Sequence, residues 1–336
     1  MSAAATIWIW LKRLLKTITL LIVVAILAAI GYEQINRYSA AAEFPAPGRM
    51  VSVDGYNMHL SCTGSGTPVV LLESGLTGLG SLQWYVVQPA VARNTTVCAY
   101  DRAGILWSEP RNRPRTGDRM IEELGKLLDA AEIRPPYVMV GHSLGGGLIR
   151  MFDARFPGTA AGFVFVDSGH EDQLTRMPQD PNRTMPPPDW MLTAFSLTGL
   201  IRLMSAGTVD DLPMPAAKAV EALSPYSVHG LYGEMASIDD TTRQLKDATS
   251  GARGSLGSRP VVVLTRTKYD SNESRVPWME MQAELAALST NSDQRLIPET
   301  THFIHLEDPE AVVQAILDVV RSARDGTPLA HAPSSP

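Results

Sequence analysis

A glycine-flanked serine lies near the middle of this chain, in the run Gly141-His142-Ser143-Leu144-Gly145. An apolar stretch typical of a strand directly precedes the run, and a stretch typical of a helix follows it. In this context the serine can occupy a turn too tight for a Cβ atom at the flanking positions. A serine hydroxyl presented in this way attacks a carbonyl carbon when a base removes its proton. The sequence therefore predicts nucleophilic chemistry at Ser143.

A candidate base stands near the end of the chain. His302 follows the short strand-like run 294–298 and begins a loop that ends at Asp308-Pro309, which is typical of a helix start. A histidine between the last strand and the last helix can reach over the sheet edge toward Ser143, so we expect His302 to be the base. His305 is interpreted as a packed or solvated loop residue.

A carboxylate is needed to orient that imidazole and to stabilise its charged form. The β-branched run 260–265 predicts a buried parallel strand, and the loop after it carries Asp270 and then Glu273. We expect Asp270 to take this role. Glu273 remains an alternative, and so does Asp167, which ends another strand-like run.

An oxyanion hole requires two backbone N–H donors close to the nucleophile. One is expected from Leu144, directly after the serine, and the other from the loop that follows the apolar strand 69–72. In that loop the candidate donor is Leu76.

These residues belong to four segments that, in this order, resemble the α/β-hydrolase fold family of the serine-nucleophile, lid-bearing type. The resemblance covers about residues 50–324 and implies a mostly parallel eight-stranded sheet, helices on both faces and a helical lid inserted after the sixth strand. Two positions depart from the family pattern: Leu106 and Thr301 stand where glycine is usual. The four segments are Val69–Trp84, Val97–Gly104, the GHSLGGG run with its helix, and His302–Glu310.

The chain starts with a segment of a different kind. Residues 17–32 carry no charge and would cover about 24 Å as a helix, and Lys12, Arg13 and Lys16 precede them. We interpret this segment as a transmembrane signal anchor, with the N-terminus in the cytoplasm and the catalytic domain on the extracytoplasmic side. A cleaved secretory signal ending near Ala40-Ala41-Ala42 is the competing interpretation.

The expected organisation follows from these assignments. The expected parts are a cytoplasmic segment 1–16, the anchor 17–32, a linker 33–48, a first core part 49–169, the lid 170–258, a second core part 259–324 and a disordered tail 325–336. Within the linker, the Ala/Pro-rich stretch from Ser39 to Gly48 is expected to be flexible or extended. In the lid, Leu197, Ile201 and Met204 are candidates for lining the substrate pocket.

Composition narrows the remaining possibilities. The 336 residues carry a formal net charge of −6 and no basic run outside the membrane flank, so nucleic-acid binding is not supported. No cofactor or metal site is expected, because neither C-x-x-C nor a Cys/His pairing occurs. The two cysteines, Cys62 and Cys98, fall on strands that are neighbours in the family's strand order. They form either a disulfide or two buried thiols.

The expected function is that of a serine hydrolase. It would cleave an ester-like bond of a small or lipid-like acyl substrate through an acyl-enzyme intermediate. Thioester, lactone, amide and carbon–carbon bonds remain alternatives within this chemistry. A membrane-anchored binding protein that keeps the fold without turnover is the alternative of a different class.

Overall fold

A single twisted sheet forms the centre of the molecule. The computed structural model describes residues 3–111, 114–178, 186–205, 212–249, 252–269 and 271–329. The eight strands lie in the order β1-β2-β4-β3-β5-β6-β7-β8, and β2 is antiparallel to both neighbours while the other pairs are parallel. This confirms the predicted fold class. The strands are β1 (Arg49–Val53), β2 (Tyr56–Thr63), β3 (Val69–Glu73), β4 (Val97–Tyr100), β5 (Tyr137–His142), β6 (Ala160–Val166), β7 (Val261–Arg266) and β8 (Ser292–Ile297).

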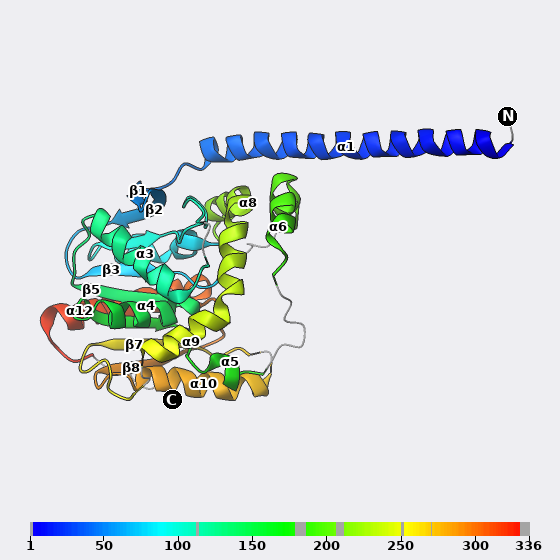
Figure 1. The fold of residues 1–336 in the computed structure, drawn as a ribbon. Coiled ribbons are helices and arrows are strands. Elements are labelled where there is room, and N and C mark those ends of the chain that lie inside the picture. Colours follow the sequence, from blue (N-terminus) through cyan, green and yellow to red (C-terminus); the bar gives the residue numbers. More distant parts are fainter. Residues whose placement is uncertain are drawn as a thin grey trace.

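Helices cover both faces of the sheet (Figure 1). The central strands are therefore buried on two sides, which is why β3, β5, β6 and β7 are continuous apolar runs rather than alternating ones. One core lies under α3 (Gly117–Ala130), α4 (Leu144–Arg155) and α10 (Asn272–Ala286). The other lies under η1 (Gly80–Trp84), α2 (Val87–Val91) and α12 (Pro309–Asp325), with α11 (Ile304–Glu307) beside η1.

The lid is helical and is inserted between β6 and β7, as expected. Its two longest helices pack on each other, and α9 also packs against α3 and α4 of the core. The lid thus packs directly on α4, the helix that begins just after Ser143. Its helices are α5 (Gln173–Arg176), α6 (Asp189–Leu197), α7 (Leu200–Ser205), α8 (Met214–Ala236) and α9 (Ile238–Ala248).

The helix α1 (Ala3–Glu43) projects far beyond the rest of the molecule (Figure 1). It is the one described helix long and apolar enough to cross a membrane, and its most apolar window is not buried. The linker expected from residue 33 is helical as far as Glu43, so the flexible or extended backbone expected from Ser39 is wrong for Ser39 to Glu43. Ala40, Ala41 and Ala42 favour helix strongly, and the helix stops just before Pro45, whose ring disfavours helical backbone at the preceding residue.

Two smaller expectations can be compared with the structure at the edges of the core. Asp325 ends α12 and Leu329 is buried in a core cluster, so the disordered tail expected from 325 does not begin there. Residues 330–336 lie outside the described part of the chain. Cys62 and Cys98 face each other across β2 and β4 and are joined by a disulfide.

Candidate active site

The backbone at Ser143 is forced into an unusual conformation by the strand-to-helix turn. β5 ends at His142 and α4 begins at Leu144, which leaves Ser143 at a φ of 52°. A Cβ atom added to Gly141 would lie 2.5 Å from the carbonyl oxygen of Gly145, and one added to Gly145 would lie 2.5 Å from that of Glu73. Both flanking glycines are therefore required by close backbone approach, as the motif predicts.

Three side chains form a continuous hydrogen-bonded chain at the carboxyl edge of the sheet. The Ser143 hydroxyl lies 2.9 Å from Nε2 of His302, and Nδ1 of His302 lies 2.6 Å from Oδ2 of Asp167. Because a carboxylate only accepts, Nδ1 carries the proton, and Nε2 of the neutral ring is the acceptor for the serine. The arrangement has the geometry needed for base-assisted nucleophilic attack.

Sheet register explains why the carboxylate is Asp167. His142 of β5 is paired with Val166 of β6, so the next residue of each strand, Ser143 and Asp167, emerges at the same level. Both residues have a positive φ, 52° and 41°, which directs the two side chains out of the strand path. The preferred candidate, Asp270, lies outside the described residues.

The carboxylate at Nδ1 of His302 is therefore Asp167, which the sequence offered only as an alternative. The other alternative, Glu273, is exposed in the first turn of α10. The sequence signal for the carboxylate that contacts His302 was present, because Asp167 stands at the immediate end of a strand.

The Asp167 carboxylate is completely buried, and its second oxygen is also occupied. Oδ1 accepts hydrogen bonds from Nε1 of Trp278 at 2.8 Å and from the backbone N–H of Arg266 at 3.3 Å. These donors satisfy the buried charge and fix the plane of the carboxylate. The imidazole of His302 is thus held by a group that is itself rigidly held.

A second histidine supports the first. Nε2 of His142 donates a hydrogen bond of 2.9 Å to the carbonyl oxygen of His302, which ties the histidine loop to β5. The His142 ring also packs on His305, with ring centroids 4.3 Å apart. Burial lowers the pKa of His142 well below its usual range and lowers the pKa of His305 to about 3. Both rings are therefore neutral, and neither adds positive charge beside His302.

The loop after β3 lies against the nucleophile. A Cβ atom added to Gly75 would lie 3.2 Å from the Cβ of Ser143. The guanidinium of Arg102 holds this loop by donating to the carbonyl oxygens of Ser74 and Gly75, each at 2.7 Å. The sequence indicates the segment that contains Arg102 but not this role of its side chain.

Arg102 is itself held by two buried carboxylates. Its Nη1 lies 2.7 Å from Glu73, at the end of β3, and its Nη2 lies 2.7 Å from Glu234 of the lid helix α8. Burial opposes the charge on Arg102, but the two carboxylates raise its pKa above the usual value. Burial also raises the pKa of Glu73. The cluster connects the sheet edge, the loop beside Ser143 and the lid.

A cavity of about 120 Å³ opens at the serine. Leu76 and Leu144 line it beside Ser143, and the lid helices α5 and α9 close it. The lid candidates Leu197, Ile201 and Met204 are not among its lining residues, because they lie on α6 and α7 rather than on the helices over the serine. The further lining residues are Gly147, Met151, Gly169, His170, Gln173, Leu174, Ile238, Thr241, Thr242 and Leu245.

The cavity wall is a feature that the sequence did not reveal. His170, Gln173 and Thr241 give it a few polar groups among mainly apolar ones. Burial lowers the pKa of His170, so this ring favours the neutral form. In the described part of the chain, no cluster of three or more His, Cys, Asp or Glu side chains is arranged to hold a metal ion.

A doubly wound sheet that presents a serine, an imidazole and a carboxylate at its carboxyl edge defines a hydrolase-type architecture. The model of the alpha/beta hydrolase family matches residues 69–315, which is more than half of the chain. The protein belongs to this family, as the sequence resemblance implied.

The chain is also similar to individual proteins and solved structures. The chain is 25% identical over 274 residues to the uncharacterized protein YqjL of Bacillus subtilis, covering 80% of this chain and 90% of the relative. Among solved structures, it is similar to the epoxide hydrolase CorEH, with a TM-score of 0.59, 18% identity and coverage of 80% and 96% of the two chains. It is also similar to a meta-cleavage product hydrolase from Pseudomonas fluorescens, with a TM-score of 0.58, 16% identity and coverage of 83% and 99%. At these identities the structures show the shared fold.

Proposed function

We propose that this protein is a serine hydrolase that cleaves an ester-like bond of a small or lipid-like acyl substrate. The observation that carries the proposal is the hydrogen-bonded chain from Ser143 through His302 to Asp167. A binding protein without turnover has no need of this chain or of the strained backbone beneath the serine. A serine at the turn also argues against an aspartate-nucleophile reaction.

The proposed reaction has two halves. The Ser143 hydroxyl attacks the carbonyl carbon, His302 takes the hydroxyl proton at Nε2 and then gives it to the leaving group, and an acyl-enzyme forms. Water next attacks the acyl-enzyme, with His302 again acting as the base, and Ser143 is released. Asp167 keeps the proton on Nδ1 and stabilises the imidazolium in both halves.

The oxyanion that develops in each half requires donors beside the serine. Leu144 is the first residue of α4, so its N–H has no partner within the helix. The N–H of Gly75 is donated to Gln83, whereas the N–H of Leu76 has no partner among the described residues. Leu144 and Leu76 are therefore the proposed oxyanion donors, and each such donor is worth about 3 kcal/mol of transition-state stabilisation.

A serine-directed fluorophosphonate probe tests the nucleophile. We expect the probe to label the wild-type protein and to label Ser143→Ala not at all. Ser255→Ala is the matched control, because Ser255 is exposed and far from His302 in the fold, and it should be labelled like the wild type. Undiminished labelling of the Ser143 variant would exclude this serine as the nucleophile.

We further propose that residues 17–32 of α1 cross a membrane. The support is the length and apolar surface of the helix, together with the basic residues Lys12, Arg13 and Lys16 before the apolar run. These charges favour a cytoplasmic N-terminus and an extracytoplasmic catalytic domain. Protease treatment of sealed, right-side-out vesicles tests this orientation. Without detergent, the protease should digest the catalytic domain, because the domain lies on the outer side.

A further inference from the structure

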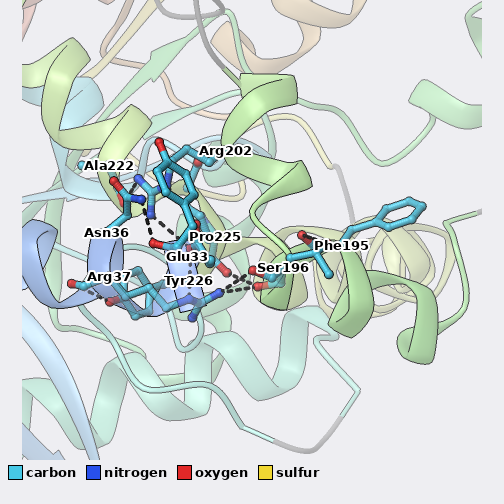
Figure 2. Close-up of polar contacts among 12 residues, drawn as sticks. Glu33, Asn36, Arg37, Phe195, Ser196, Arg202, Ala222, Pro225 and Tyr226 are labelled. Atoms are coloured by element: carbon cyan, nitrogen blue, oxygen red, sulfur yellow. Dashed lines mark hydrogen bonds and ion pairs between the residues drawn. The ribbon is translucent and has the colours of Figure 1, made fainter. Parts of the chain in front are cut away.

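The end of the anchor helix is bound to the lid. Glu33, the first residue after the apolar run, is completely buried. Its two oxygens accept from Arg202 of α7 at 3.0 and 3.1 Å and from Arg37, one turn further along α1, at 3.0 Å (Figure 2). A carboxylate is buried in this way only where partners compensate for its lost hydration. We call Glu33, Arg37 and Arg202 the anchor clamp.

The anchor clamp extends to a second lid helix. Nη2 of Arg37 donates to the hydroxyl and carbonyl oxygens of Ser196 in α6, at 2.7 and 3.0 Å (Figure 2). The guanidinium also stacks over the ring of Tyr226 in α8, 4.8 Å from its centroid, and the Tyr226 hydroxyl donates to the carbonyl oxygen of Arg37. Three lid helices therefore contact the same turn of α1.

The chain between α1 and the sheet is fixed as well. Nε1 of Trp107 donates to the carbonyl oxygen of Phe44 at 2.9 Å, and the buried ring of His59 contacts the carbonyl oxygen of Pro47. Contacts on both sides of the last helical turn thus hold α1 against the domain. The direction of the anchor determines which face of the domain meets the bilayer.

The clamp places α6 and α7 at the membrane boundary. Arg202 pairs with Glu33, directly after the apolar segment, and Ser196 contacts Arg37, which is four residues further on, or about 6 Å along the helix. The headgroup layer on each side of a bilayer is about 5–7 Å thick. In Figure 1, α6 lies beside α1, and the two helices are in contact. Both contacts therefore fall within the headgroup layer.

The side chains that α6 and α7 leave exposed are mostly apolar, and Asp189 and Thr193 of α6 are the exposed polar ones. Leu203 and Met204 follow Arg202, so the helical repeat turns them away from the anchor clamp, and they are 74% and 60% exposed. Trp190, at the start of α6, is 70% exposed. Tryptophan is enriched at membrane–water interfaces, where its ring contacts apolar groups and its N–H contacts water. We call Trp190, Leu197, Leu203 and Met204 the lid apolar face.

We propose that the lid apolar face lies in the headgroup and upper acyl region of the same bilayer that α1 crosses. This inference rests on the membrane anchor proposed above. The bilayer is what covers the lid apolar face, because the anchor clamp fixes α6 and α7 at the level where the apolar segment of α1 ends. Exposed apolar side chains at that level gain free energy by leaving water for lipid. The part of the lid formed by α6 and α7 then faces the membrane, beside the helices α5 and α9 that line the serine cavity.

Site-directed spin labelling of the full chain in phosphatidylcholine–phosphatidylglycerol vesicles tests the proposal. The native cysteines are paired, so a single introduced cysteine is labelled selectively. We compare Leu203→Cys with Leu296→Cys, a matched exposed leucine on the edge strand β8, and with Ile22→Cys in the apolar part of α1. The measurement is the accessibility of the nitroxide to oxygen and to a water-soluble nickel chelate.

We expect the label at 203 to be several-fold more accessible to oxygen than to the chelate, as at 22, and the label at 296 to show the reverse. If the label at 22 is in lipid but the label at 203 is as accessible to the chelate as the label at 296, the lid proposal is overturned and the proposed anchor stands. If 22 is also open to the chelate, the anchor itself fails and the lid proposal with it. Met204→Cys repeats the measurement at a second position.

Discussion

Replacing Asp167 by asparagine is the substitution that tests the active site most sharply. Oδ1 of Asp167 accepts hydrogen bonds from Nε1 of Trp278 and from the N–H of Arg266, while Oδ2 faces Nδ1 of His302. In Asp167→Asn, the amide oxygen must stay with the two donors, because an NH₂ group there would oppose both of them. The NH₂ group therefore turns toward His302.

This orientation forces the wrong tautomer on the imidazole. With an NH₂ group as its neighbour, Nδ1 of His302 must accept, so the ring proton moves to Nε2, which then cannot take the proton of Ser143. A tautomer exchange of this kind costs about 10⁴-fold in kcat, or about 5.5 kcal/mol in the activation free energy. Asp270→Asn should change kcat less than about threefold, because Nδ1 is already occupied by Asp167.

The assay is steady-state hydrolysis of a short-chain chromogenic aryl ester by the two variants and the wild type, purified under identical conditions. Circular dichroism checks that the variants are folded. The reasoning is refuted if Asp270→Asn loses as much activity as Asp167→Asn, or if folded Asp167→Asn keeps kcat within about tenfold of the wild type.

Two further predictions concern stability. Arg102→Met leaves two buried carboxylates without their cation and should lower the free energy of unfolding by about 3–5 kcal/mol in denaturant titrations. The control Arg134→Met removes an exposed ion pair and should lower that free energy by less than about 1 kcal/mol. Equal effects of the two substitutions would contradict the assigned role of Arg102. Burial alone would lower the pKa of His59, but its hydrogen bond to Asp101 and the charge of that carboxylate raise the pKa overall. Since the folded pKa is raised, the stabilisation is complete below about pH 6.5, the unfolded value, and is lost as pH rises through the folded pKa. The stability difference between wild type and His59→Gln should therefore shrink as pH rises above about 6.5, and a difference that grows with pH would reverse the assigned sign.

The local sequence was sufficient to predict the nucleophile turn. Gly141 and Gly145 permit a backbone approach that any Cβ would block, and this requirement is visible wherever the strand–serine–helix pattern stands. The loop that carries His302 was likewise predicted from a strand before it and a proline-marked helix start after it. Each of these features depends on residues that are neighbours in the chain.

The carboxylate could not be chosen in that way. Asp167, Asp270 and Glu273 all follow strand-like runs, and the choice depends on the pairing of His142 with Val166 across two strands. Sequence also indicated the lid but not its lining. The α9 residues that line the cavity include Thr241 and Thr242, which are less apolar than the candidates Leu197, Ile201 and Met204. Which face of a lid helix meets the serine depends on how the helices cross.

The sequence by itself determined the family, the serine turn, the reach of the histidine loop and the apolar length of the first helix, since these follow from local sterics and from the alternation of strands and helices. Only the tertiary structure decided which carboxylate meets the imidazole, which helices line the cavity and which lid helices hold the end of α1. Each of these depends on contacts between segments far apart in the chain. The buried Glu33, which pairs with a residue 169 positions away in the lid, shows the reason: its partner exists only once the chain has folded.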